Sequence, residues 1–170
     1  MPKLKKRSAT SSCLNLNPGE YYERLNTNDI RRAVISKTPF IAGKSSGTDG
    51  RPSVYGRWEY DFDHTLPNQN YTPTGAKPIR YVVYSYGWHF PMYIWDEVTQ
   101  RWYGNRDKYS RTTTRHQYAA NPTFFTSDTP NRAITWLDTD KMIAIARYGV
   151  FATVCHAAGG NAFAFDNTED

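Results

Sequence analysis

Cysteine is scarce in this chain of 170 residues, which contains only Cys13 and Cys155. Two cysteines so far apart provide neither the disulfide framework of a small secreted protein nor the paired ligands of a structural zinc site. Long apolar runs are missing too, since no stretch approaches the roughly 18 apolar residues that a membrane-spanning helix requires. The basic N-terminal stretch is not followed by the apolar region of a secretory signal. These absences favour a cytoplasmic protein with reduced thiols and no membrane contact.

Motifs for catalysis and for metal binding are also missing. No G-x-S-x-G motif marks a nucleophile at a strand-to-helix turn. Cys155 and His156 are adjacent, and neighbours on a strand point to opposite faces, so they do not suggest a catalytic pair. No two of the four histidines have the H-x-x-x-H spacing of zinc ligands; they are His64, His89, His116 and His156. We therefore expect no catalytic residues, no metal and no cofactor.

One metal site stays open as an alternative. Glu59, Asp61 and Asp63, with His64 beside them, offer ligands of the kind that hold a divalent cation. Carboxylates that alternate along the polar face of a strand explain the first three residues without any metal. The strand is the favoured interpretation.

Acidic residues are outnumbered by basic ones, 16 against 21, which gives a formal net charge of +5. An excess of this size is compatible with an anionic partner but does not require one. The distribution is more informative, because residues 101–115 hold five cations and a single acid, Asp107. We expect residues 1–18 to form a flexible basic arm, residues 19–165 one domain, and residues 166–170 an acidic tail.

Aromatic residues are abundant, at 15% of the chain, and they suit both sheet cores and flat binding faces. IRYVVYSY at 79–86 is β-branched and aromatic throughout, which predicts a strand. Residues 88–95 predict a second strand, which Pro91 confines to a sheet edge or a bulge. Residues 101–103 predict a third strand after a turn. Together they form a β-meander centred on 79–103.

The remaining elements are less regular. Short strands are predicted at 39–43 and at 55–62, and helical periodicity appears at 21–37 and at 132–148. Thr27 or Asn28 is the expected cap within the first helix, and Asp138 or Thr139 within the second, where Trp136, Ile143 and Ala144 form the expected buried stripe. The fold class that follows is α+β, a single domain in which a small antiparallel β-meander sheet carries a few helices against one side, with its core motif at 79–121.

The segment KYSRTTTRHQ at 108–117 concentrates cations and hydroxyl groups. Thr114 and Gln117 match a capping box, in which the threonine hydroxyl accepts a hydrogen bond from an early helix N–H group and the glutamine reaches back. A helix N-terminus attracts anions through its unpaired N–H groups and its dipole. The expected binding residues are Arg101, Arg106, Lys108, Tyr109, Arg111, Thr112, Thr113, Arg115 and His116.

Two interpretations of this segment remain open. In the first, the cations neutralise phosphates and Tyr109, together with Tyr103 and the nearby Trp102, stacks on nucleic-acid bases. In the second, Thr114 and Gln117 only cap a helix, the aromatic side chains belong to the core, and the arginines are solvated. The two are compatible, because one helix end can serve both purposes.

Residues 81–117, YVVYSYGWHFPMYIWDEVTQRWYGNRDKYSRTTTRHQ, resemble a widespread family of small, functionally uncharacterised proteins of bacteriophages, archaeal viruses and their hosts. Family members share a Y-V-V-x-S-Y strand, a T-P-I-A-like strand, a hairpin tryptophan and Y-S-x-T-T-S-x-H-Q. The matching positions are Tyr81, Val82, Val83, Ser85, Tyr86, Trp102, Tyr109, Ser110, Thr112, Thr113, His116 and Gln117. The chain departs from the family at 90–93, which are F-P-M-Y, and at Thr114, where serine is commoner.

The resemblance implies a viral or mobile-element origin and a protein made inside a microbial cell, but it transfers no catalytic residue. We expect a small, non-enzymatic, phage-type accessory protein that acts by binding in the host cytoplasm or as part of the virion. DNA or RNA is the favoured partner. The alternative is a protein–protein module, either a host-factor inhibitor or a minor virion component. A nuclease that uses His116 ranks third.

Overall fold

The computed structural model describes residues 20–43, 52–60, 78–123 and 134–150. The predicted basic arm at 1–18 and the predicted acidic tail at 166–170 lie outside these residues. Among the helices that are described, none has the length and the apolar character needed to cross a membrane.

Seven strands form one mixed sheet whose spatial order follows the chain: β1 (Glu23–Leu25), β2 (Phe40–Ala42), β3 (Val54–Tyr60), β4 (Pro78–Ser85), β5 (Pro91–Asp96), β6 (Arg101–Asn105) and β7 (Ile134–Leu137). Neighbouring strands are antiparallel from β2 to β6. The edge strands β1 and β7 each join in parallel. The predicted meander is confirmed as β4, β5 and β6, and it lies within a wider sheet.

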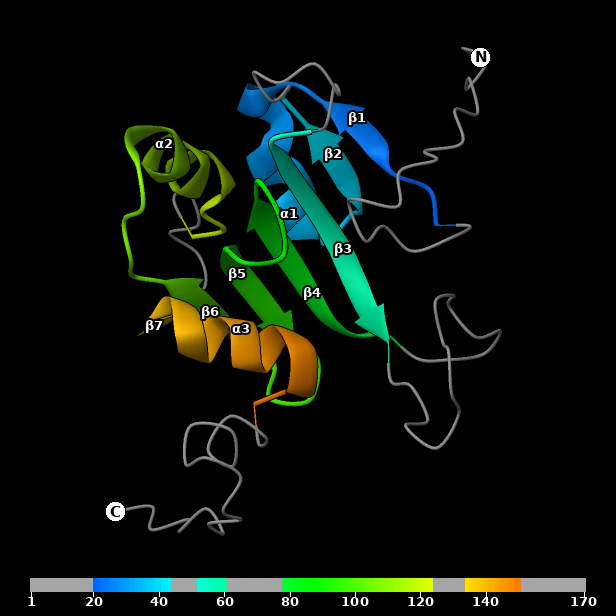
Figure 1. Ribbon diagram of the computed structural model, residues 1–170. Coiled ribbons are helices and arrows are strands. Elements are labelled where there is room, and N and C mark those ends of the chain that lie inside the picture. The colour runs from blue at the N-terminus through cyan, green and yellow to red at the C-terminus, as the bar shows by residue number, and fades with distance from the viewer. Residues whose placement is uncertain (1–19, 44–51, 61–77, 124–133, 151–170) are drawn as a thin grey trace, which may run out of the picture.

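Three α-helices pack against this sheet: α1 (Ile30–Ser36), which follows a short 3-10 turn at Thr27–Asp29, α2 (Arg111–Ala120) and α3 (Thr139–Tyr148). The first two lie on one face of the sheet and α3 lies on the other (Figure 1). The fold class is α+β, as predicted, but the prediction of helices on one side only is wrong.

The two covered faces follow from the alternation of side chains along β4. Tyr81 and Val83 belong to the core beneath α1 and α2, whereas Val82 and Tyr84 belong to the core beneath α3. Successive side chains of a strand point to opposite faces. An uninterrupted run of apolar and aromatic residues therefore needs cover on both sides, and the structure provides it.

Pro91 stands at the first residue of β5, which is a central strand. The pairing of β4 with β5 shifts register between Val83 and Tyr84, and Pro91 lies opposite Tyr84. Proline lacks the N–H group that a regular ladder uses, and a register shift accommodates it. The expected bulge is confirmed, and the alternative of an edge strand is wrong.

Both long helices predicted from periodicity are wrong in their first halves. Within 21–37, β1 pairs with β2, and the Glu23 N–H group donates to the Pro39 carbonyl at 3.0 Å. Neither Thr27 nor Asn28 caps α1, because the residue before that helix is Asp29, which makes no side-chain cap hydrogen bond. Here the hydrogen bonds between an edge strand and its parallel neighbour outweigh the local helix propensity of the same residues.

The second half of the chain shows the same pattern. β7 occupies residues that were expected to be helical, and Trp136 on that strand is 46% exposed rather than buried. Asp138 is confirmed as the cap of α3, since its Oδ1 accepts a hydrogen bond from the Lys141 N–H group at 3.0 Å. Gly149 ends α3 with φ 89°, a conformation that glycine adopts without a steric penalty.

The predicted capping box at the start of α2 is wrong. Ser110 is the N-cap: its backbone is extended, and its Oγ accepts a hydrogen bond from the Thr113 N–H group at 3.1 Å. Thr114 lies inside the first turn, and its hydroxyl donates to the Ser110 carbonyl at 2.9 Å. Gln117 faces the preceding loop instead of reaching back to a cap. Ser110 takes the role because it is the last extended residue before the helix, where a side chain can meet the free N–H groups.

Candidate nucleic-acid interface at the start of α2

The loop between β6 and α2 is held by the buried amide of Gln117. The Gln117 Nε2 donates to the carbonyls of Asn105 at 2.9 Å and Asp107 at 3.1 Å. Its Oε1 accepts a hydrogen bond from the Lys108 Nζ at 3.0 Å. Since Gln117 is only 3% exposed, these bonds replace those that water would make. The amide fixes where the chain enters α2.

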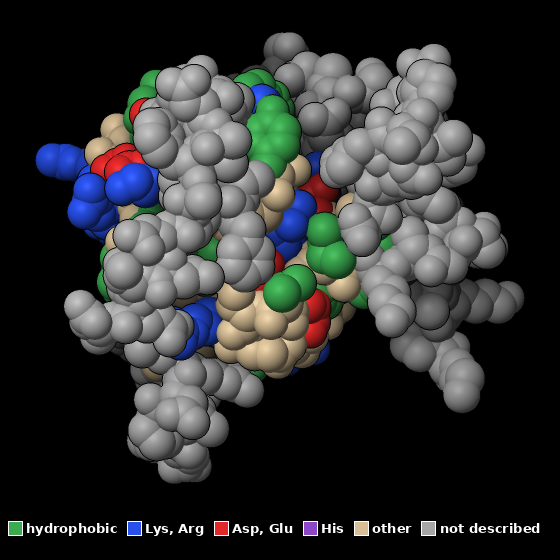
Figure 2. All heavy atoms as spheres, turned by 90° about the horizontal axis from the view of Figure 1, so that it is seen from below, with side chains coloured by type: hydrophobic (Ala, Val, Ile, Leu, Met, Phe, Trp, Pro, Cys, Tyr) green, Lys and Arg blue, Asp and Glu red, His purple; other side chains and the backbone are tan. Residues whose placement is uncertain are grey.

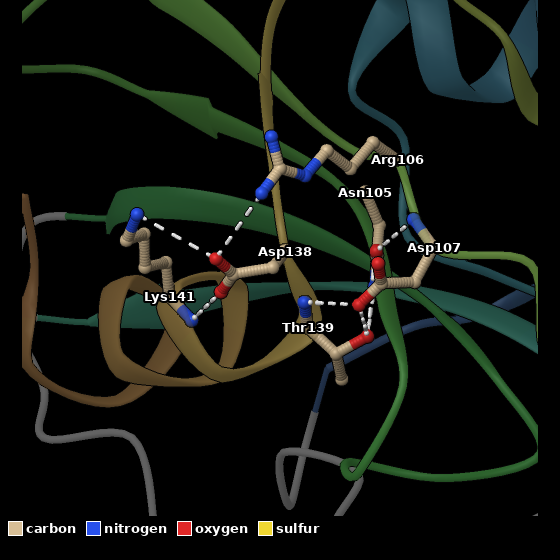
Figure 3. Close-up of polar contacts among 6 residues, drawn as sticks. All are labelled: Asn105, Arg106, Asp107, Asp138, Thr139 and Lys141. Atoms are coloured by element: carbon tan, nitrogen blue, oxygen red, sulfur yellow. Dashed lines mark hydrogen bonds and ion pairs between the residues drawn. The ribbon is translucent and has the colours of Figure 1, made fainter.

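A second set of contacts ties this loop to the start of α3 (Figure 3). The Asp107 Oδ2 accepts hydrogen bonds from the Thr139 N–H group at 2.8 Å and from the Thr139 hydroxyl at 2.7 Å. The backbone bond first, and then the hydroxyl bond, lower the pKa of Asp107. Asn105 adds a hydrogen bond from its Nδ2 to the Thr139 hydroxyl at 3.1 Å. The only acid among residues 101–115 is therefore used to join the two helix starts.

The basic residues of α2 stand on its outer face. Arg111 and Arg115 are both exposed and are one helical turn apart. Within the described part of the chain neither forms an ion pair, and α2 itself contains no acidic residue. Residues four apart on a helix project from the same side. These two guanidinium groups therefore form an exposed pair with no carboxylate on their own helix.

The other expected cations are less available. The Arg106 guanidinium lies 3.7 Å from the Asp138 carboxylate, which also pairs with Lys141 (Figure 3). Lys108 is exposed but donates to Gln117. Arg101 is exposed at the opposite end of β6 from the start of α2. Lys108 lies just before α2, and Arg111 and Arg115 lie within that helix. Arg101 lies at the other end of β6.

The aromatic residues expected to stack on bases also differ in how exposed they are. Tyr109 is 83% exposed, and its ring lies 6.2 Å from that of Phe90. Trp102 and Tyr103 are buried, on opposite faces of the sheet. Of the three rings considered for base stacking, the structure leaves only Tyr109 accessible.

Thr112 is exposed next to Arg111, whereas Thr113 is buried at 2% exposure. The Thr113 hydroxyl lies 3.0 Å from the Ser110 Oγ. Thr113 therefore contributes to the cap, and Thr112 is the threonine that can contact a ligand.

His116 is buried at 6% exposure, and its Nδ1 shares a hydrogen bond of 2.8 Å with the Ser85 Oγ. Burial lowers the pKa of the imidazole and so favours its neutral form. On its other side the ring of Tyr86 lies 5.3 Å away. Ser85 is itself 1% exposed. This environment favours a structural role, a link between α2 and β4, over proton transfer to an external substrate.

Two exposed aromatic residues near this junction were missed in the sequence. Tyr86 and Trp88, each 46% exposed, lie in the turn between β4 and β5. Tyr86 has φ 60°, which is uncommon for a residue other than glycine. The neighbouring Gly87, with φ 154°, is the one local signal of a turn that projects its side chains outward.

No cluster of metal ligands occurs among the described residues. Of the alternative carboxylate site, only Glu59 is described. Its Oε1 lies 2.7 Å from the Arg57 guanidinium and accepts a hydrogen bond from the Tyr84 hydroxyl at 3.2 Å. Asp61, Asp63 and His64 lie outside the described residues. Glu59 thus has a structural partner in Arg57.

The face of the molecule seen from below carries charges of both signs. Figure 2 shows basic and acidic side chains next to one another on this face. At the start of α3, Asp138 likewise pairs with both Arg106 and Lys141. Opposite charges placed together weaken the field that would attract a polyanion. The exposed arginines of α2 are therefore the better candidates for phosphate contact.

Comparison of the chain with protein-family models, with curated proteins and with solved structures found no match. A functional proposal therefore rests on the geometry at the start of α2.

Proposed function

We propose that this protein is a small, non-enzymatic nucleic-acid-binding protein, and that Arg111 and Arg115 on the outer face of α2 are its main phosphate contacts. Lys108 and the exposed Thr112 extend the contact, and Tyr109 adds an aromatic face. The setting that accompanies this proposal is the cytoplasm of a microbial cell infected by a virus. The single observation that carries it is the pair of exposed arginines on a helix without acids.

The size of the contact sets its expected salt dependence. Lys108, Arg111 and Arg115 together neutralise about three phosphates, and each contact lowers the logarithmic salt slope by about 0.9 on duplex DNA and about 0.7 on a single strand. Between 50 and 200 mM salt, the affinity should then fall about 40-fold for a duplex and about 20-fold for a single strand. Release of condensed counterions is the reason for both numbers.

The test is fluorescence anisotropy with labelled DNA and RNA oligonucleotides across a salt series. The double variant Arg111→Ala with Arg115→Ala should reduce the salt slope by about 1.8 on a duplex and about 1.4 on a single strand, and should weaken binding at low salt. Arg24 and Arg101 are also exposed, and they lie on the far edge strand and at the far end of β6. The double variant Arg24→Ala with Arg101→Ala removes the same charge and should leave the slope near that of the parent chain.

Equal losses in the two double variants would contradict the assignment to α2, because they would report net charge and not a site. Binding that does not depend on salt, or none at micromolar protein, would contradict nucleic-acid binding itself. Thermal melts of both variants show whether either substitution unfolds the domain.

A second candidate function is a protein–protein module, either a host-factor inhibitor or a minor virion component. The observation that favours it is the number of exposed aromatic side chains, since tyrosine and tryptophan are enriched in protein interfaces; among the described residues these are Tyr21, Tyr86, Trp88, Tyr109, Tyr118, Trp136 and Tyr148. A pull-down from nuclease-treated host lysate separates the candidates. A protein partner that survives the nuclease and is lost with Trp88→Ala favours this second function.

A further inference from the structure

We infer that the ligand of the α2 surface is single-stranded nucleic acid, with bases stacking on exposed aromatic rings of the β4–β5 turn and on Tyr109. This inference rests on the proposed function and goes further by naming the form of the nucleic acid. The residues that carry it are three exposed rings, Tyr86, Trp88 and Tyr109, together with Arg111 and Arg115 of α2 and Arg147, which lies over the Trp88 ring.

The β4–β5 turn places Tyr86 against the same helix that carries the arginines. The Tyr86 ring lies 5.3 Å from that of His116, which directly follows Arg115 in α2. The Tyr86 backbone is anchored, because its N–H group donates to the Ser53 carbonyl at 2.8 Å. With φ 60° this anchored backbone directs the side chain away from the path of β4. Tyr86 is therefore held in place and is still 46% exposed.

Tyr109 reaches the same turn from the other side. Its ring contacts Phe90 at 6.2 Å. The carbonyl of Phe90 accepts a hydrogen bond from the Ser85 N–H group at 3.1 Å, so Phe90 lies opposite the residue before Tyr86. Two exposed tyrosines thus stand at the same end of the β4–β5 hairpin, and Arg111 is two residues after Tyr109 in the chain.

Trp88 extends this aromatic surface across the tip of the turn. It is two residues from Tyr86, and the guanidinium of Arg147 lies 4.1 Å from the centroid of its ring. A cation over one face of an indole leaves the opposite face for a base, and the same cation can contact a neighbouring phosphate. A cation of α3 therefore lies against the aromatic turn, and α2 contacts the turn through His116.

This arrangement fits single strands better than duplexes. In a duplex the faces of the bases are covered by their stacked neighbours, whereas a single strand can turn its bases out onto protein rings. Every base has such a face, so the contact tolerates any sequence. The charge of α2 favours a polyanion over an apolar protein surface, since this helix carries Arg111 and Arg115 and no carboxylate.

The experiment compares a labelled 20-mer of deoxythymidine, which forms no duplex, with a mixed-sequence duplex of the same length. Tyr109→Ala and Trp88→Ala should each weaken binding to the single strand about 5- to 150-fold, the range found for loss of one stacked base. Binding to the duplex should change less than twofold. Tyr109→Phe keeps the ring and should bind like the parent chain. Tyr21, which is 60% exposed on the segment before β1, provides the control Tyr21→Ala.

Two further readouts separate stacking from charge. Tyr109→Ala should leave the salt slope unchanged, because a stacked ring releases no counterions, whereas Arg111→Ala should reduce it. Stacking on Trp88 should quench tryptophan fluorescence on titration with the single strand, and Trp88→Phe should remove that part of the quenching.

The possible results distinguish failure of the single-strand inference from failure of the proposed nucleic-acid-binding function. If binding is salt-dependent and lost in the α2 arginine variants, but equal for single strand and duplex and unchanged in Tyr109→Ala and Trp88→Ala, the single-strand inference fails and the proposed function stands. If neither nucleic acid binds, both fail. If the ring variants lose a protein partner and bind nucleic acid normally, the aromatic turn belongs to a protein interface and the inference is overturned.

Discussion

Replacing Gln117 with alanine should destabilise the fold by about 2–4 kcal/mol. The amide donates two hydrogen bonds, to the carbonyls of Asn105 and Asp107, and accepts a third from Lys108. Each of the two bonds to carbonyls contributes roughly 0.5–1.5 kcal/mol, and a buried carbonyl left without its donor costs more than this mean. Removal of buried side-chain carbon adds about 0.8 kcal/mol per methylene group.

Urea unfolding followed by tryptophan fluorescence measures this change, and for a chain of this size a loss of 2–4 kcal/mol corresponds to a fall in the melting temperature of roughly 4–16 °C. Gln117→Glu sharpens the test, because it preserves length and the contact with Lys108 but turns an oxygen toward the two carbonyls. At pH 7 this variant should be at least as unstable as Gln117→Ala.

The pH dependence of Gln117→Glu follows from the same geometry. A carboxylate that faces two carbonyls and is buried has a raised pKa in the folded state. The folded chain then binds a proton that the unfolded chain does not, so the variant should gain stability, relative to the parent, as the pH falls through the raised pKa. Two results together would refute the role of the Gln117 amide in holding the β6–α2 loop. They are a free energy of unfolding for Gln117→Ala within about 0.5 kcal/mol of the parent chain, and no gain in stability for Gln117→Glu as the pH falls.

Three further predictions concern the cap, the sheet and the buried histidine. Ser110→Ala should lower the free energy of unfolding by about 1 kcal/mol, and Thr114→Ala should lower it clearly less, as measured by urea unfolding. A larger loss in Thr114→Ala would contradict Ser110 as the N-cap and favour the capping box at Thr114. Gly104→Ala should cost roughly 1–3 kcal/mol, since an added Cβ would lie 2.8 Å from the Trp136 ring, and near-UV circular dichroism should report the displaced indole. Burial lowers the pKa of His116, so as the pH falls below about 6.5 the unfolded chain binds a proton before the folded chain does. The free energy of unfolding should therefore decrease from that pH until the folded pKa is passed. His116→Gln should lack this decrease, and a variant with the same pH dependence of stability as the parent chain would contradict a buried His116 with a lowered pKa.

The central strands were predictable because their residues leave few alternatives. IRYVVYSY contains β-branched and aromatic side chains at almost every position, and such runs fit a pleated, buried surface. The register shift at Pro91 was predictable for a related reason, since proline cannot complete a regular ladder. In both cases the local chemistry and the final structure agree.

The edge strands were not predictable from local pattern. β1 and β7 are short, and each is fixed by a parallel neighbour that comes from elsewhere in the chain. Their residues also have helical spacing when they are joined to α1 and α3. Periodicity within one window contains no information about a distant partner strand, so the helices were predicted to be too long.

The exposure of Arg111, Arg115 and Tyr109 agrees with the sequence prediction, whereas the burial of Trp102 and Tyr103 was not predictable. Helices cover both faces of the sheet, so neighbouring residues of β6, Trp102 and Tyr103, are both buried. A one-sided sheet would have exposed one of them. Tyr86 and Trp88 are exposed because a turn with two positive φ angles projects them, and the sequence Y-G-W gives only a weak sign of such a turn.

The capping error has a simple physical origin. Ser110, Thr112, Thr113 and Thr114 carry hydroxyl groups of nearly equal capping ability, so residue type alone selects none of them. What decides is where the chain stops being extended, and this point is set by Gln117 through its bonds to the loop. Gln117 was predicted to reach back to the cap, but it bonds to the loop instead.

The structure separates two groups of cations that the sequence places side by side. Arg106 meets the carboxylate of Asp138, and Lys108 is bonded to Gln117, so both help to hold the β6–α2 loop. Arg111 and Arg115 follow on α2, three and seven residues after Lys108, and make no ion pair within the described part of the chain. Substitution of the first group should therefore reduce stability and binding together, whereas substitution of the second should reduce binding alone. A chain in which all four positions lowered stability equally would have no separate binding surface on α2.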